Sequence, residues 1–212
     1  MPQDRPPALI LHEDPVSGNC YKIRLTAALL GLPLARRFYD IRKGDTRTSE
    51  FLNAVNPNGR IPVLQIGEGA AARYLPESNA ACWYLAQGTP LIPADRFAQA
   101  DMLHWMFFEQ YNHEPNVATL RFWLALIGEA QLTPEQLAAI PAKRASGSAA
   151  LTLMDSHLAT RDWFVGDAVT LADIALYAYT HVAEEGGFAL AETPHVAAWC
   201  ARMTDVTGYV AL

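Results

Sequence analysis

Hydrophobic and polar positions change their periodicity once along this chain of 212 residues, near residue 90. Before that point, short apolar runs of the kind that form strands are separated by helix-length segments. The runs that predict strands are residues 8–12, 35–41, 61–66 and 71–75. The segments that predict helices are residues 17–30, 49–53 and 77–85. The predicted order of elements is therefore β-α-β-α-β-β-α.

The connections between these elements predict how the strands pair. A strand, a helix and a second strand at the start imply a parallel pair with a right-handed crossover. A short turn with Gly67 and Gly69 joins the last two strands, and such turns connect antiparallel neighbours. We therefore expect a small α/β domain over residues 1–86, with an antiparallel hairpin at one side of its sheet.

After residue 86 the pattern becomes helical throughout. Residues 87–94 contain one glycine and two prolines without any periodicity, which is typical of a linker. Residues 95–212 predict an all-α domain. Its expected helices are 95–113, 117–127, 133–158, one that begins at the capping box Thr170–Asp173, and 196–203. We expect Pro115 to kink or interrupt the chain between the first two of these helices. We also expect breaks near Pro141 and Gly147 in the third.

The charge of the chain argues against one class of partner and mildly favours another. The net charge is −6, and phosphate backbones need a basic face, so we expect no nucleic acid partner. Residues 1–86 hold ten Lys and Arg against eight Asp and Glu, whereas residues 87–212 hold six against fourteen. The slightly basic first part suits a small anionic ligand.

Compartment and metal content follow from what the sequence lacks. No apolar run reaches the roughly 18 residues of a transmembrane helix, and Met1–Pro7 lacks the apolar core of a signal peptide. The three cysteines, Cys20, Cys82 and Cys200, are far apart and form no C-x-x-C. The histidines form no H-E-x-x-H motif and no cluster with cysteine. We expect a cytoplasmic protein without a disulfide framework or a metal site.

The stretch Asn56–Leu64 combines two turn-forming dipeptides with a strand that begins at a proline. Pro62 cannot donate to a strand ladder, which places it at the start of the strand. Glu77–Ser78 then opens a helix, whose free N–H groups and dipole favour an anion. Exposed backbone beside a helix N-terminus is suited to an extended, negatively charged peptide.

Four fragments of the chain, in this order, resemble the cytosolic glutathione transferases, and in particular bacterial members. They are Ser17–Lys22, Asn56–Leu64, Glu77–Ser78 and Val165–Ile174. The resemblance extends from Leu9 to about Met203. It implies a thioredoxin-like N-terminal domain followed by an all-α C-terminal helical bundle, and a homodimer.

The resemblance also implies a site for glutathione, an extended anionic tripeptide. Ile61 is expected to give its backbone groups to the cysteinyl part, with a cis bond to Pro62, although X-Pro bonds are trans by default. Glu77 and Ser78 are expected to hold the γ-glutamyl end. Arg60 and Arg47 are expected to face the glycyl carboxylate.

The residue beside the sulfur has more than one interpretation. From its chemistry alone, Ser17 is the N-cap of the first helix. The resemblance instead makes its hydroxyl a donor to the glutathione thiolate, which lowers the thiol pKa. Asn19 is a second cap, or a residue near the sulfur as in glutathione-dependent disulfide reductases. Cys20 falls three positions past the sulfur-facing residue, and we interpret it as packing beneath the helix.

The implied activity is transfer of glutathione, as a co-substrate, to a hydrophobic electrophile, a reaction that serves detoxification. The electrophile is expected over an apolar pocket of the helical domain. His104 lies among aromatic residues where the family places this second site and its dimer contacts. Two alternatives stay open: a glutathione-dependent disulfide-bond reductase and a non-catalytic binding module on the same fold.

Overall fold

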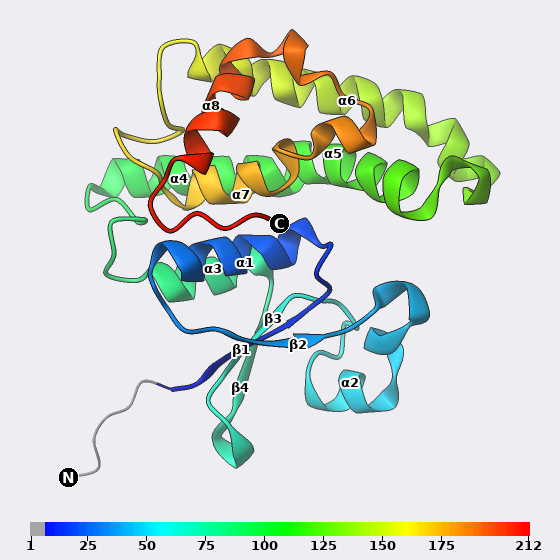
Figure 1. Ribbon diagram of the computed structural model, residues 1–212, viewed down its shortest axis with the longest axis vertical. Coiled ribbons are helices and arrows are strands. Elements are labelled where there is room, and N and C mark those ends of the chain that lie inside the picture. Colours follow the sequence, from blue (N-terminus) through cyan, green and yellow to red (C-terminus); the bar gives the residue numbers. More distant parts are fainter. Residues whose placement is uncertain (1–6) are drawn as a thin grey trace. The chain divides into compact units, whose positions relative to one another are not determined.

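The computed structural model describes residues 7–212 and is shown in Figure 1. Residues 1–6, on which much of the argument about a signal peptide rests, lie outside the described part. The chain forms two compact units, one made of residues up to Gln87 together with Thr207–Leu212, the other of Gly88–Val206. The sequence interpretation had assigned 207–212 to the helical domain, whereas their contacts place them in the first unit.

The first unit is built on a four-stranded sheet with the order β2-β1-β3-β4. Its strands are β1 Leu9–Glu13, β2 Ala35–Phe38, β3 Val63–Ile66 and β4 Arg73–Pro76. Strand β1 runs parallel to β2 and antiparallel to β3, and β3 pairs antiparallel with β4. The parallel first pair and the antiparallel hairpin are thus confirmed, and the fold is thioredoxin-like.

Helices cover both faces of this sheet. They are α1 Gly18–Leu29, α2 Ser49–Ala54 and α3 Ser78–Ala86. In Figure 1, α1 and α3 lie together on one side of the strands and α2 lies on the other. Neighbouring residues of β1 point to opposite faces: Glu13 pairs with Arg24 of α1, whereas His12 stacks on Tyr39, whose ring packs against Phe51 of α2.

Strands β2 and β3 are shorter than expected, each for a local reason. Strand β2 ends at Phe38 because the Asp40 side chain accepts from the backbone N–H of Arg42 at 3.0 Å and starts a 3₁₀ turn. Strand β3 begins at Val63 because Pro62 has no N–H to donate. Ile61 therefore precedes the ladder, and its bond to Pro62 is cis as the resemblance implied.

The end of the chain packs on α1. The hydroxyl of Tyr21, which is fully buried, donates to the backbone carbonyl of Val210 at 2.7 Å. Gly208 has φ +88°, and a Cβ there would lie 3.0 Å from the carbonyl oxygen of Ala28. This close approach of two backbones explains why glycine occupies the position.

The second unit is helical, with no strand anywhere in residues 88–206, all of which the structure describes. Its α-helices are α4 Arg96–Phe108, α5 Glu114–Arg121, α6 Pro134–Leu158, α7 Leu171–Thr180 and α8 Pro194–Thr204. Pro115 lies in the first turn of α5, directly after a π-helical turn at Glu109–His113. The expected interruption therefore takes the form of a wider turn rather than a gap. None of the helices within residues 7–212 is long and apolar enough to cross a membrane.

The expected breaks in the 133–158 region are wrong, since α6 is continuous. Pro141 is exposed, as is Leu137 one turn earlier, so water can donate to the carbonyl that loses its helical partner. Gly147 is buried, and a Cβ there would lie 2.5 Å from the ring of Phe188. Glycine at this position accommodates a packed ring and does not end the helix.

The capping box of α7 is confirmed and lies at the centre of this unit. One carboxylate oxygen of Asp173 accepts from the N–H and the hydroxyl of Thr170, at 2.9 and 3.0 Å. The other accepts from the N–H of Phe164 and the indole of Trp199, both at 3.1 Å. Asp173 therefore joins the start of α7 to α8 and to the loop between α6 and α7.

Candidate functional site

Three chain segments that carry predicted site residues meet at one end of the sheet, where strands begin and finish. The strand register pairs His12 with Val63 and Val63 with Pro76. The carboxyl ends of β1 and β4 therefore lie beside the amino end of β3. This end of the sheet therefore brings together the turn that leads to Ser17, the residue Ile61 and the start of α3.

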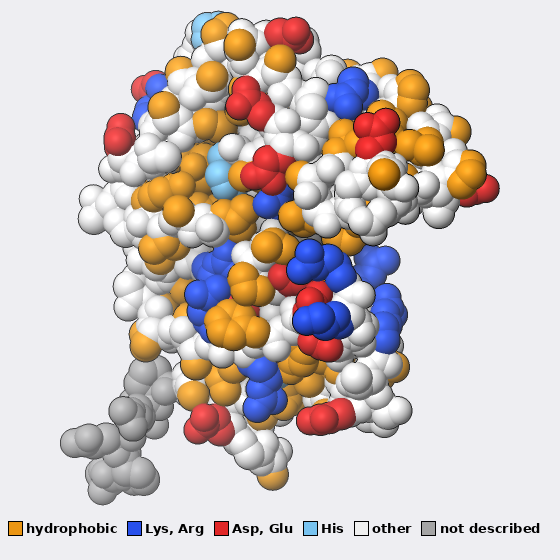
Figure 2. Space-filling view, turned by 45° about the vertical axis from the view of Figure 1, so that its right-hand side comes forward, with side chains coloured by type: hydrophobic (Ala, Val, Ile, Leu, Met, Phe, Trp, Pro, Cys, Tyr) orange, Lys and Arg blue, Asp and Glu red, His pale blue; other side chains and the backbone are white. Residues whose placement is uncertain are grey.

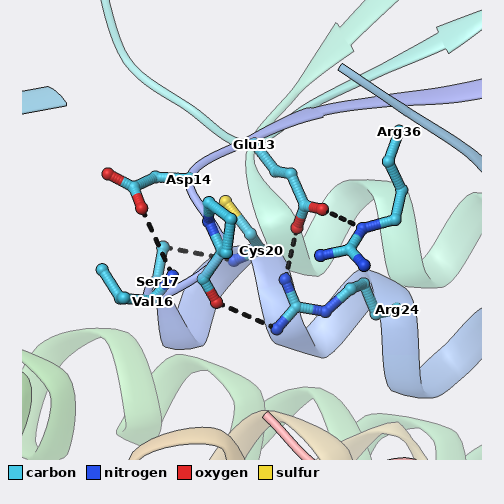
Figure 3. A network of polar contacts seen from close by, with 8 residues as sticks. Glu13, Asp14, Val16, Ser17, Cys20, Arg24 and Arg36 are labelled. Carbon is cyan, nitrogen blue, oxygen red and sulfur yellow. Dashed lines mark hydrogen bonds and ion pairs between the residues drawn. The ribbon is translucent and has the colours of Figure 1, made fainter. Parts of the chain in front are cut away.

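The turn after β1 presents Ser17 at the N-terminus of α1 (Figure 3). Ser17 is half-buried, and its Oγ accepts from the backbone N–H of Cys20 at 3.3 Å. Its own N–H donates to the carbonyl of Asp14 at 3.0 Å. The side chain of Asp14 accepts from the N–H of Val16 at 3.3 Å. Ser17 is thus an N-cap, and a hydroxyl that caps through its lone pairs still has its proton to donate to a ligand.

Cys20 does not have the character of a reactive thiol. Its side chain is fully buried, and burial raises its pKa to about 12. A thiol that stays protonated at neutral pH is a poor nucleophile. The interpretation of Cys20 as a packing residue under α1 is confirmed.

Asn19 and Ser78 are in direct contact. The hydroxyl of Ser78 donates to the Oδ1 of Asn19 at 3.2 Å, which links the first turns of α3 and α1. Ser78 is buried, with 5% of its surface exposed, and Asn19 is half-buried. A residue expected near the sulfur and a residue expected at the γ-glutamyl end are therefore neighbours.

Glu77 precedes α3 in an unusual backbone conformation. It is the one non-glycine residue within 7–212 with a positive φ, at φ 70° and ψ 115°. Such a conformation costs about 1–3 kcal/mol and is found mostly at functional sites. Its side chain is exposed beside the backbone N–H groups that open α3. No local pattern in the sequence indicates this strain.

The loop before Ile61 is held by a residue that the sequence analysis treated only as a turn former. The side chain of Asn56, 5% exposed, donates to the carbonyl of Arg60 at 2.8 Å. It also accepts from the N–H of Asn58 at 3.0 Å. Ile61 follows directly, half-buried and outside the strand ladder. The Asn-Pro dipeptide was the available signal for this role.

The two predicted arginines are exposed and lie at the same turn. Arg47 donates from Nη1 to the carbonyl of Asn58 at 3.2 Å. Its guanidinium lies over Gly59, where a Cβ would be 2.6 Å from Nη1. Arg60 is exposed in the same turn. Figure 2 shows further Lys and Arg side chains on a face of this unit. Arg42 and Lys43, which both pair with Asp40, are 55% and 79% exposed. The positive charges of Arg47 and Arg60 at this turn favour an anionic ligand.

The second unit has a hollow of about 560 Å³ along α4. It is lined by Ala100, Leu103, His104, Phe107, Phe108, Tyr111 and Asn112. Phe107 and Tyr111 are 68% and 85% exposed. Trp105 is buried and packs on Phe164, so it belongs to the core and not to this surface.

Within the described residues, no group of three His, Cys, Asp or Glu side chains is placed to hold a metal ion. Around Ser17, Ile61 and Ser78, this end of the sheet presents hydroxyl, amide, carboxylate and backbone groups.

Comparisons with known proteins match both parts of the chain to one family. Residues 16–87 match the family model of the glutathione S-transferase N-terminal domain, and residues 118–205 match that of the C-terminal domain. A possible glutathione S-transferase from Rhodopseudomonas palustris is 45% identical, with a TM-score of 0.88 over 96% of this chain and 89% of that one. A glutathione S-transferase from Pseudomonas fluorescens is 42% identical, with a TM-score of 0.89 over 96% of this chain and 98% of that one. Glutathione S-transferase 3 from Zea mays is 33% identical over 90% of this chain and 86% of its own length.

Two further similarities concern ligand and role. A glutathione transferase from Burkholderia graminis, 25% identical with a TM-score of 0.81, was solved with two glutathione molecules per subunit, the match covering 98% of this chain and 88% of that one. Elongation factor 1-gamma from Prunus avium is 33% identical over 79% of this chain but only 38% of its own length. From the two domain matches and the similarity to whole relatives, the chain belongs to the glutathione S-transferase family.

Proposed function

We propose that this protein is a glutathione transferase that binds glutathione on its first unit and uses the thiolate as a nucleophile. The observation that carries the proposal is that Ser17, Ile61 and Ser78 lie together at one end of the sheet. A hydroxyl, a backbone segment outside the ladder and a helix N-terminus are the groups that a thiol-containing anionic peptide requires.

The proposed roles follow from what each group can donate or accept. The N–H and C=O of Ile61 pair with the cysteinyl backbone of glutathione, as an added strand pairs with a sheet edge. Ser78 and the first turn of α3 bind the γ-glutamyl carboxylate, and the carboxylate of Glu77 takes its ammonium group. Arg47 and Arg60 face the glycyl carboxylate.

Ser17 acts on the sulfur without becoming a base or a nucleophile. Its hydroxyl donates to the thiolate, and the positive end of the α1 dipole adds to the same effect. The thiol proton is lost to solvent as the thiolate forms. The thiolate then forms the carbon–sulfur bond by addition to an electrophile, or by substitution with loss of a leaving group.

We further propose that the aromatic hollow on α4 receives a hydrophobic electrophile. Its exposed rings supply apolar contact area, and His104 is held there by Asp101 at 3.4 Å. Detoxification in the cytoplasm by a homodimer is the role in keeping with this chemistry.

Replacement of Ser17 tests the proposed activation. One hydrogen bond to a charged group contributes about 1.5–3 kcal/mol, so Ser17→Ala is expected to raise the pKa of bound glutathione by about one to two units. Turnover of a chlorinated aromatic substrate at neutral pH should fall, while affinity for glutathione changes little. The pH dependence of kcat/KM gives the thiol pKa, and Ser17→Thr, which keeps a capping hydroxyl, is the matched control. Unchanged activity of Ser17→Ala would exclude the proposed role.

Glutathione-dependent disulfide reduction is the second candidate, favoured by the position of Asn19. Its hydrogen bond to Ser78 holds an amide in the first turn of α1, two residues after Ser17. In this reaction the glutathione thiolate attacks one disulfide sulfur and forms a mixed disulfide, while the original S–S bond breaks and the other sulfur leaves as a thiolate. Turnover of a small disulfide compared with that of an aryl halide separates the two enzymes. Failure to bind glutathione-agarose would favour a non-catalytic binding module instead.

A further inference from the structure

A buried carboxylate with two arginines lies directly behind the turn that presents Ser17 (Figure 3). Glu13, the last residue of β1, is fully buried. One of its oxygens pairs with Nη1 of Arg24 and the other with Nε of Arg36. Both oxygens are thus engaged, one by α1 and one by β2. Removing one partner of such a buried carboxylate strongly destabilises the folded protein, because an uncompensated charge stays buried.

Beyond Glu13, the two arginines make different contacts, and Arg24 alone also lies over the ring of Tyr21, 5.6 Å from the ring centroid. The second nitrogen of Arg24, Nη2, donates to the backbone carbonyl of Pro15 at 3.2 Å. Pro15 lies in the turn itself, two residues before Ser17. Arg36 instead places its guanidinium over the ring of Phe38, 4.9 Å from the ring centroid, on the far side of Glu13 from the turn. Only 10% of the Arg24 side chain is exposed, against 40% for Arg36.

We propose that Arg24 is a positioning residue that sets the place of the Ser17 hydroxyl relative to the glutathione sulfur. The inference rests on the proposed function and extends it to a residue that does not touch the ligand. A planar guanidinium presents its donors in a fixed fork. With one arm bound to Glu13, the other can reach Pro15 only when the turn occupies its present place.

The opposite side of the turn is held independently. The Oδ1 of Asp14 accepts from the N–H of Val16, and its Oδ2 accepts from the N–H of Ile41, both at 3.3 Å. The turn is thus fixed between the residues that follow β2 and the guanidinium of Arg24. Fixation matters because a hydrogen bond weakens steeply when its geometry is lost, and small displacements at a reacting centre reduce rates strongly.

A merely structural role for the ion network makes a different prediction from a positioning role. Arg24→Met and Arg36→Met each remove one partner of Glu13, and both should lower stability. Only Arg24→Met also removes the contact with Pro15. The pair therefore separates loss of a buried ion pair from loss of the contact with the turn.

The experiment measures kcat, KM for glutathione and the pKa of the bound thiol for the intact wild-type chain and both variants, with an aryl halide as electrophile. For Arg24→Met we expect the thiol pKa to rise by about one unit and kcat at neutral pH to fall about tenfold, with KM within about threefold. Arg36→Met should keep the wild-type thiol pKa. Arg24→Lys keeps one charge without the fork and should resemble Arg24→Met in thiol pKa. Equal shifts for Arg24→Met and Arg36→Met, or no shift for folded Arg24→Met, would overturn the inference.

A double variant shows whether Arg24 acts through Ser17. If it does, adding Arg24→Met to Ser17→Ala should raise the thiol pKa no further, because the hydroxyl that Arg24 positions is already absent. A full additional shift in the double variant contradicts the inference while leaving the role of Ser17 intact. Failure of the proposed function looks different: wild-type protein would not bind glutathione, or Ser17→Ala alone would have no effect.

Discussion

Ser78 donates a hydrogen bond of 3.2 Å to the side-chain oxygen of Asn19, 59 residues earlier in the chain. The bond ties the first turn of α3, proposed to bind the γ-glutamyl group, to the first turn of α1, which directly follows Ser17, the residue proposed to activate the sulfur. The proposed site for the γ-glutamyl group and the proposed site for the sulfur are therefore linked by one side-chain contact. No sequence pattern shows this, because the two residues are neighbours only through the packing of α1 against α3.

This contact predicts that Asn19 and Ser78 act together. Ser78→Ala removes the hydroxyl that ties the start of α3 to Asn19, so glutathione binding should weaken by about threefold to tenfold. Asn19→Ala removes the same bond from the other side and should weaken binding by a similar factor. A double-mutant cycle on glutathione affinity is expected to give a coupling energy of about 0.5–1.5 kcal/mol. Strict additivity of the two substitutions would contradict the coupling.

Asn56 is predicted to control affinity without affecting the thiol. Asn56→Ala removes the bonds to Asn58 and Arg60 that shape the loop before Ile61. Because the loop backbone then loses two partners, KM for glutathione should rise about tenfold, whereas the thiol pKa should stay at its wild-type value. Asn53→Ala, an exposed asparagine of α2, is the matched control. A shift of thiol pKa in Asn56→Ala would assign that loop a different role.

The sequence predicted the fold well because its local signals agreed with one another. Apolar runs, turn residues and the Thr170–Asp173 box each determine structure within a few residues of themselves. The wrong prediction, a break in α6, came from treating Pro141 and Gly147 by propensity alone. Solvent exposure of one and the ring packed on the other decide their effect, and both depend on tertiary structure.

The candidate site was predictable only in part for the same reason. Ser17 and Ile61 stand in local motifs, and a family resemblance could assign them roles that remain predictions. The strain at Glu77, the tie between Asn56 and Arg60 and the fork of Arg24 depend on segments brought together by folding. A single sequence carries no signal for such contacts.

Cys20 is predicted to be dispensable for catalysis. Its thiol is buried and its pKa is raised to about 12, so Cys20→Ala should keep kcat/KM within about threefold. The backbone N–H that donates to Ser17 is unaffected by the substitution. Steady-state kinetics with an aryl halide and with a small disulfide provide the measurement. Loss of either activity in a folded Cys20→Ala protein would restore this thiol as a candidate nucleophile.

Asp173 is predicted to make stability depend on pH. Complete burial raises its pKa to about 6 from the ordinary 3.8, against the opposing effect of its hydrogen bonds with Thr170, Phe164 and Trp199. Between these two values the folded protein binds more protons at this site than the unfolded chain does, so its contribution to the free energy of unfolding falls as pH rises through this range. The loss corresponds to about 3 kcal/mol for a shift of roughly two units and is complete above about pH 6.

Comparison with Asp173→Asn isolates this contribution, because all other titrating groups are common to both proteins. The introduced amide cannot ionise, and its N–H₂ group meets the N–H of Thr170, so the variant should be less stable at every pH. Urea unfolding at intervals between about pH 4 and about pH 7.5 gives the difference in unfolding free energy between the two proteins. That difference should be largest near the acid end of the range and shrink as pH rises. A difference that is constant, or that grows with pH, would mean that Asp173 stays ionised in the folded protein throughout.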